Sequence, residues 1–272
     1  MTRAVPRLLK AYLVVVLTLM ALPLVSVMAL SLNESAYGTL PFSFSTRWYE
    51  ALASNSSLVQ ALITSLNLAV QAMVFATIVG TLLSLALVRS GKAVNLPVNG
   101  LLLALLTVPA LVLAAGFVIV FDWIGLGSSS TSLVLASVVT SLPFVVLIVS
   151  GRLRDLDPNL AQAARSLGAG PVRVFTTVTV PLVGPAIVAG AMLAFLTTFN
   201  NFAIQLFLSP IGISTLPVQI YSMVRLGVTP DVNALATLII LATIALVVVI
   251  TWFSGNAARF LSTSKNSEEN DG

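Results

Sequence analysis

The side chains able to do chemistry in this 272-residue chain are few, and their types point to hydrogen bonding. The chain contains neither Cys nor His, which removes thiolate nucleophiles, the usual general base and the commonest metal ligand. What remains inside a long apolar stretch is a group of amides: Asn200, Asn201 and Gln205. Amides both donate and accept hydrogen bonds. The sequence therefore predicts no catalytic residue and no metal site, but it offers a candidate contact for a polar solute.

The spacing of these amides decides which of them could act together. Successive residues of a helix point about 100° apart, so Asn200 and Asn201 cannot both face the same neighbour. Gln205 follows Asn201 by four residues, which places that pair on one face of a continuous helix. Asn201 with Gln205 is thus the preferred pair for a solute pathway. Intramembrane amides also join helices to one another, and Asn67 with Gln71, again four residues apart, poses the same choice.

The composition places these amides in a membrane. Hydrophobic residues make up 58% of the chain and charged residues only 8%, against about 25% charged residues in ordinary globular proteins. The mean hydropathy is +1.05 and the sequence pI is near 9.9. Basic residues scattered through so apolar a chain do not form a nucleic-acid-binding patch. The expected solvent is lipid.

Long stretches without Asp, Glu, Lys or Arg define the expected membrane helices, since a span needs about 20 mostly apolar residues. They predict six spans, at residues 9–31, 60–88, 98–121, 131–150, 182–208 and 231–254. Thr229-Pro230-Asp231 is a helix-start signal for the last one. Four prolines lie in or beside the spans and are able to kink them: Pro23, Pro109, Pro143 and Pro185.

Six spans put both termini on the same side of the membrane. If that side is the cytoplasm, all of the 13 basic residues except Arg47 and Arg225 lie inside. This asymmetry is the positive-inside signal. The first apolar stretch is longer than the apolar region of a signal peptide, about 7–15 residues, so we expect it to be retained as a span. The localisation predicted is a bacterial inner membrane, with N- and C-termini cytoplasmic.

One cytoplasmic loop, residues 151–181, is long enough to form structure of its own. Asp157-Pro158 predicts a helix start, and Gly168 suits the left-handed residue that ends a helix. Gly170-Pro171 begins a second helix that runs into Pro181. Apolar residues at three- and four-residue spacing form one face: Leu153, Leu156, Leu160, Ala164 and Leu167. By pattern alone, such a helix either lies on the lipid headgroups or docks into a groove of another protein.

The residues of this loop resemble a known signature. Gln162-Ala163-Ala164, three residues, Gly168, nine residues and then Val178-Thr179-Val180-Pro181 resembles the EAA loop of ATP-binding-cassette (ABC) importer permeases. That signature reads Glu-Ala-Ala, three residues, Gly, nine residues and Ile-x-Leu-Pro. Gln162 replaces the usual Glu, and Val stands for both Ile and Leu. The spacing matches throughout.

The resemblance implies an all-α polytopic membrane protein with the type I ABC importer permease architecture. The loop would be a coupling helix docked on a separate ATPase subunit, present in two copies, and the residues carried over to that contact are Leu160, Gln162, Ala163, Ala164, Leu167, Gly168 and Pro181. A second permease subunit, an extracytoplasmic substrate-binding protein and membrane lipid complete the expected partners. ATP and Mg would bind to the ATPase subunits. No cofactor would bind to this chain, which contains no P-loop.

The segment from Leu216 to Thr237 is similar to spermidine/putrescine importer permeases. A polyamine is therefore the leading substrate. The family pattern has an acidic pair in the fifth span, where this chain has Asn200-Asn201. Amides attract cations less than carboxylates do, so an amino-acid derivative, an organophosphonate or an iron complex stays open as an alternative.

The chain is expected to divide into three parts. Residues 1–59 form the first span and an extracytoplasmic loop, 60–254 the permease core, and 255–272 a disordered cytoplasmic tail. The alternative to an importer permease is a secondary transporter or channel working alone. Such proteins often carry ionisable groups inside their spans, and none lies well inside a span here.

Overall fold

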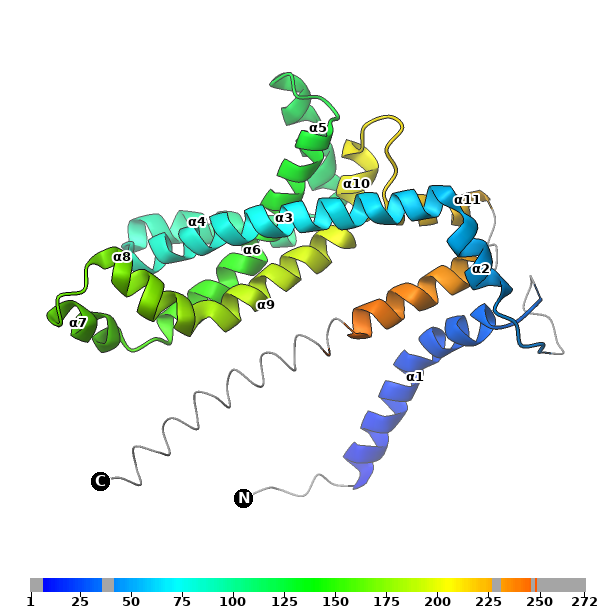
Figure 1. Ribbon diagram of the computed structural model, residues 1–272, viewed down its shortest axis with the longest axis horizontal. Coiled ribbons are helices and arrows are strands. Elements are labelled where there is room, and N and C mark those ends of the chain that lie inside the picture. Colours follow the sequence, from blue (N-terminus) through cyan, green and yellow to red (C-terminus); the bar gives the residue numbers. More distant parts are fainter. Residues whose placement is uncertain (1–6, 36–41, 227–230, 246–247, 249–272) are drawn as a thin grey trace. The chain divides into compact units, whose positions relative to one another are not determined.

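The computed structural model describes residues 7–35, 42–226, 231–245 and 248 (Figure 1). These residues are helical apart from the connections and an isolated antiparallel bridge between Asn33 and Phe44. The helices are α1 (Arg7–Ser31), α2 (Arg47–Ser54), α3 (Ser56–Arg89), α4 (Lys92–Thr107), α5 (Ala110–Trp123), α6 (Ser130–Arg154), α7 (Pro158–Ser166), α8 (Pro171–Val174), the π-helix η1 (Phe175–Thr179), α9 (Val180–Phe199), α10 (Phe202–Leu208), α11 (Leu216–Leu226) and a further helix, Asp231–Ala245.

Within the described ranges, four helical stretches are long and apolar enough to cross a membrane: Ala11–Ser31, Ser56–Arg89, Ser130–Arg154 and Pro171–Phe199. A fifth is counted if α4 and α5 form one broken span. The expectation of a single helix over 98–121 is wrong, because α4 and α5 meet at a bend of 113°. The break falls at Val108-Pro109: Val108 is extended, with ψ of 132°, as the residue before a proline prefers.

The helix expected over 182–208 is also broken. α9 ends at Phe199 and α10 begins at Phe202. At the other end of α9, the helical path starts at Pro171 rather than at 182, because α8, η1 and α9 follow one another without a gap. Of the last expected span, 231–254, the structure describes Asp231–Ala245 and Val248. Thr229-Pro230 and the tail 255–272 lie outside the described residues.

The described residues form two compact units, one from within 1–60 and 219–249 and the other from within 61–218. In the first unit, polar contacts fix the segment that follows α1. The hydroxyls of Ser31 and Tyr49 lie 2.7 Å apart, and the Trp48 indole donates to the Asn33 carbonyl oxygen at 2.8 Å. The Arg47 guanidinium lies over the Trp48 ring, 4.5 Å from its centre.

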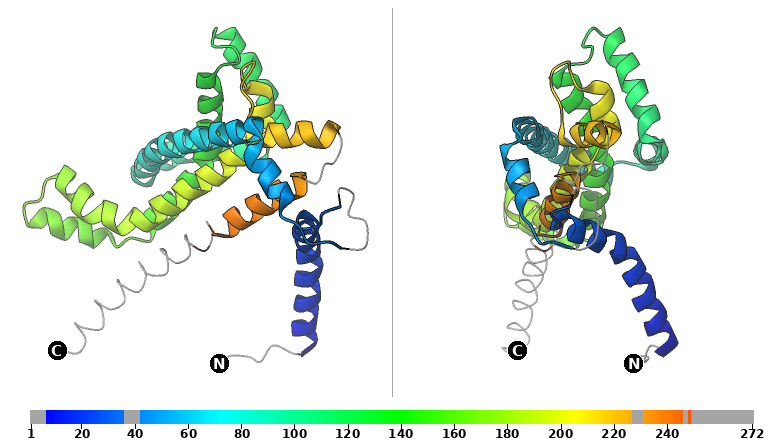
Figure 2. Two further views of the ribbon diagram at one scale, coloured as in Figure 1. Left: turned by 45° about the vertical axis from the view of Figure 1, so that its right-hand side comes forward. Right: turned by 90° about the vertical axis from the view of Figure 1, so that its right-hand side faces the viewer.

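The second unit is built on α6 and α9, which lie side by side (Figures 1 and 2). Val145 of α6 is fully buried. A Cβ added to Gly190 of α9 would lie 3.2 Å from the Val145 Cα. Ala194, four residues on, is buried in the same cluster and Ala186 packs against it. Ala186, Gly190 and Ala194, small residues at four-residue spacing on α9, thus form a helix-packing surface.

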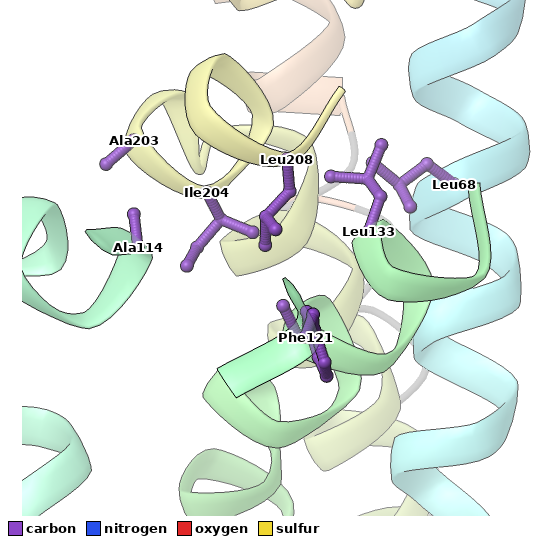
Figure 3. Close-up of a cluster of buried hydrophobic side chains, with 8 residues drawn as sticks. Leu68, Ala114, Phe121, Leu133, Ala203, Ile204 and Leu208 are labelled. Carbon is purple, nitrogen blue, oxygen red and sulfur yellow. The ribbon is translucent and has the colours of Figure 1, made fainter. Parts of the chain in front are cut away.

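A second apolar cluster holds α10 in place (Figure 3). Ile204 and Leu208 of α10 are completely buried. They lie between Phe121 of α5 and Leu133 of α6, with Leu68 of α3 at the edge of the cluster. Burying side chains of this size contributes about 1.5–3 kcal/mol each. α10 is therefore packed into the bundle although it is only seven residues long.

Candidate functional site: the loop before α9 and the break after it

The loop between α6 and α9 folds as its local signals predict. The Asp157 carboxylate caps α7 by accepting from the Asn159 backbone N–H at 2.9 Å. At the other end, Gly168 has φ of +84°, a conformation that costs glycine little. Its N–H donates to the Arg165 carbonyl at 2.9 Å, and the next N–H, of Ala169, donates to the Ala164 carbonyl at 3.1 Å. This paired closure is a Schellman motif, which ends the helix sharply.

The second helix of the loop is distorted where it meets the span. Val180 donates its N–H to Phe175, five residues back, instead of to the residue four back. Pro181 follows directly; it has no N–H, and its ring crowds the carbonyl four residues earlier. A single widened turn relieves that crowding, and such π-bulges are frequent at functional sites. Pro181 therefore shapes the junction between the loop and α9.

The apolar face expected on the loop is divided between two surfaces. Leu153 belongs to the end of α6, because α6 continues to Arg154 instead of ending at residue 150. On α7, Ala164 is half-buried against the rest of the chain, while Ala163 and Gln162 are exposed. Leu167 is 89% exposed and Leu160 is 47% exposed. Leu167, a large apolar side chain next to a fixed turn, marks a surface that suits a protein partner, whereas Leu160 lines the space between α7 and the ends of α3 and α6.

At the far end of α9, the chain makes a tight turn in the middle of the predicted span. Asn201 has φ of −79° and ψ of 76°, and the Phe202 N–H donates to the Asn200 carbonyl at 2.9 Å. These values describe an inverse γ-turn centred on Asn201. The Asn201 side chain then caps α10 by accepting from the Ile204 N–H at 3.3 Å.

Gln205 closes this break from inside. Its side chain is 0% exposed, and Nε2 donates at 2.6 Å to the Thr198 carbonyl oxygen, which also accepts from the Asn201 backbone N–H at 3.2 Å. Two buried atoms in the break have no hydrogen-bond partner in the described chain: Gln205 Oε1 and Thr198 Oγ1. The prediction that Asn201 and Gln205 share one face of a continuous helix is wrong, because the chain turns at Asn201, which caps α10, and Gln205 packs inward.

Asn200 is the amide that the turn leaves exposed. Its Nδ2 donates to the Leu196 carbonyl at 3.0 Å, and its Oδ1 accepts no hydrogen bond from a described residue. On α3, Asn67 and Gln71 are exposed as well. From the sequence alone, these two amides were candidates either for contact with a solute or for joining helices. Their exposure in a membrane span shows that they join no helix among the described residues.

The break itself was missed from sequence, and its signal was weak. No Gly or Pro marks Asn200-Asn201. Only the capping preference of Asn distinguishes the position.

In the described ranges no three acidic side chains gather in a way that could hold a metal ion.

Apolar helices of membrane length, interrupted at two places and joined by the helical loop before α9, define a polytopic membrane protein. Over residues 76–262 the chain matches the family described as "Binding-protein-dependent transport system inner membrane component". It is 36% identical over 238 residues to the spermidine/putrescine transport system permease protein PotC of Haemophilus influenzae, covering 88% of this chain and 93% of that protein. It is 35% identical over 245 residues to the putrescine transport system permease protein PotI of Escherichia coli K12, covering 87% and 86%.

Solved structures share the fold. A bacterial ABC transporter involved in the import of the acidic polysaccharide alginate matches with a TM-score of 0.70 at 15% identity, over 93% of this chain and 95% of that chain. An amino acid ABC transporter matches with a TM-score of 0.59 at 18% identity, over 77% and 98%.

The chain therefore belongs to the family of binding-protein-dependent transport system inner membrane components. It is a multi-pass inner-membrane permease of an ABC importer and not an enzyme, and in this family the ATPase is a separate subunit.

Proposed function

We propose that this chain forms half of the translocation pathway of an ATP-driven polyamine importer. It has six spans and cytoplasmic termini, and it pairs with a second permease subunit, two ATPase subunits and an extracytoplasmic binding protein. The similarity to spermidine/putrescine and putrescine permeases over more than four-fifths of the chain supports the substrate class.

The observation that carries the coupling role is the geometry of the loop. The Schellman turn at Gly168 fixes the end of α7, and Leu167 beside it is 89% exposed. We place Leu167, Ala163 and Gln162 in the contact with the ATPase subunit. Leu160 and Ala164 instead support α7 against the permease, since Ala164 is half-buried. Gly168 and Pro181 set the directions in which the chain leaves α7 and enters α9.

Closure of the ATPase subunits would then act on both ends of α9. The helical path from Pro171 to Phe199 is continuous, so a displacement of the loop is carried along about 30 Å of α9 at 1.5 Å per residue. It reaches the turn at Asn200-Asn201, where the buried, unpartnered atoms make the packing less stable than in the apolar bundle. Asn200 and Asn201, held by Gln205, form the polar contact for the solute at this position.

The four-component importer reconstituted in proteoliposomes tests this function directly. We expect uptake of labelled spermidine or putrescine only when the ATPase subunits, ATP and the loaded binding protein are all present. Uptake that persists without the ATPase would instead identify a secondary transporter or channel. ATP-dependent uptake of an amino-acid derivative, an organophosphonate or an iron complex, with no response to polyamines, would replace the substrate class and keep the importer.

A further inference from the structure

A cavity of about 290 Å³ lies behind α7, on the side turned toward the permease. Its walls come from the end of α3, the end of α6, α7 itself and the η1–α9 junction. Five leucines belong to the apolar lining: Leu85, Leu153, Leu156, Leu160 and Leu182. At about 30 Å³ per water, the volume holds roughly ten water molecules, which is room for a phosphate group and the first part of an acyl chain.

Two guanidinium groups line this cavity. Arg89 ends α3 and Arg165 lies in the last turn of α7. Neither side chain makes a hydrogen bond or ion pair with a described residue, whereas Arg152, which is not among the lining residues, donates from Nε to the Leu182 carbonyl at 3.3 Å. The carboxylate in the lining, Asp157, already caps α7. The cavity therefore combines an apolar floor with two positive charges that have no partner among the described residues and the single negative charge of Asp157.

Its position suits one class of ligand. Arg89 stands at the end of the 34-residue helix α3, where the positive-inside signal places the cytoplasmic headgroup layer. Basic pockets between helices at this level bind anionic lipid headgroups. A guanidinium matches phosphate oxygens with two parallel hydrogen bonds, and the leucine floor can take the glycerol and the nearest methylenes.

We propose that this cavity binds the phosphate of an anionic phospholipid, with Arg89 and Arg165 on the phosphate and the start of an acyl chain on the leucine floor. The proposal rests on the cytoplasmic placement of the loop in the proposed function. Because Arg89 belongs to α3 and Arg165 to α7, a bound headgroup ties the docking helix to the bundle. The lipid would hold α7 ready for the ATPase and leave Leu167 and Ala163, which lie outside the cavity lining, free for that contact.

Native mass spectrometry of the full-length permease, titrated with phosphatidylglycerol or with phosphatidylcholine of the same acyl chains, tests this site. Each basic contact at an anionic headgroup is worth about fivefold in affinity. We therefore expect tighter retention of phosphatidylglycerol, and a loss of roughly twenty- to thirtyfold in Arg89→Gln/Arg165→Gln. Arg165→Gln alone, in a helix outside the spans, should lose about fivefold while leaving the bundle intact. Arg173→Gln, a cation of the same loop outside the cavity lining, is the matched control and should change affinity less than about twofold.

Equal retention of the two lipids, or equal losses in the Arg165 and Arg173 variants, would overturn the proposal. Displacement of phosphatidylglycerol by millimolar inorganic phosphate would also overturn it, because the ligand would then be a free anion. Displacement by stoichiometric ATPase subunit would assign the cavity to the subunit interface and overturn it as well. The assay contains neither ATP nor substrate. A negative result in the lipid titration therefore says nothing against polyamine uptake. A negative result in the uptake assay does not change how the lipid titration is interpreted.

Discussion

Gly190 of α9 lies against the backbone of α6, at a point where an added Cβ would come within 3.2 Å of the Val145 Cα. Val145 is also approached from α3, since a Cβ on Gly80 would lie 2.8 Å from the Val145 Cβ. One valine is thus enclosed by glycines of two helices. Close approach of this kind is how membrane helices gain packing energy without a hydrophobic driving force between them.

Gly190→Ala should therefore destabilise the permease by about 1–3 kcal/mol, because the methyl group overpacks a fully buried contact. The measurement is the free energy of unfolding of the purified chain in lipid nanodiscs. Gly184→Ala is the matched control on the same helix, since its Cβ meets no described atom within 4 Å. Equal stability of the two variants would contradict the packing described for α6 and α9.

The loop end at Gly168 gives a prediction about backbone geometry. At φ of +84° a β-branched residue is strained, whereas Asn tolerates the left-handed region. We expect Gly168→Val to insert normally but to lose assembly with the ATPase subunit, and Gly168→Asn to retain most of it. Co-purification of the ATPase subunit with the tagged permease measures this. If Val and Asn behave alike, the turn is not what positions α7.

The local signals of this loop were readable from sequence because each one acts over a few residues. Asp157 and Gly168 cap α7 wherever the helix lies in the bundle. The effect of a proline, by contrast, could not be predicted from the local sequence. Pro109 ends a helix, yet Pro143 and Pro185 sit inside α6 and α9, and packing against neighbouring helices decides which outcome occurs.

The division of the apolar face of α7 and the turn at Asn200-Asn201 could not be predicted for a related reason. Periodicity groups Leu160, Ala164 and Leu167 on one face, but the packing of α7 against α8 and η1 decides which member of that face is covered, and it is Ala164. The turn after α9 depends on the buried contact between Gln205 and the Thr198 carbonyl, seven residues apart. The helical periodicity of apolar residues in the sequence carries no signal for such a contact.

The exposed amide at the break gives a prediction about selectivity. Asn200→Asp should lower the KM for spermidine relative to that for a neutral substrate, because a carboxylate replaces the exposed amide, whose oxygen accepts no hydrogen bond from a described residue. Uptake kinetics in proteoliposomes give both values. Gln205→Ala is the control: it removes a buried hydrogen bond worth about 1 kcal/mol and should reduce kcat and stability without changing the ratio of KM values. An altered ratio in Gln205→Ala with none in Asn200→Asp would reverse the roles given to these side chains.

The topology can be measured in a chain that has no native cysteine. Ser128→Cys, in the exposed connection before α6, should react with a membrane-impermeant maleimide in intact cells, because the account places that connection outside. Gly170→Cys, in the loop between α7 and α8, should react only after permeabilisation. Reaction at position 170 in intact cells would invert the orientation and remove the basis for ATPase docking.

The central claim is that the outer surface of α7 transmits ATP-driven work, and ATP hydrolysis stimulated by the loaded binding protein tests it most directly. Leu167→Asp places a charge where an apolar side chain would be buried, at a cost of at least about 2–3 kcal/mol, or more than tenfold in the affinity of the subunits. Val94→Asp makes the same kind of change at a residue that is 51% exposed in the first turn of α4, outside the loop. We predict that stimulated hydrolysis falls at least about tenfold in Leu167→Asp and stays near the unsubstituted rate in Val94→Asp. Full stimulation in Leu167→Asp, with the ATPase subunits still bound, would contradict the account.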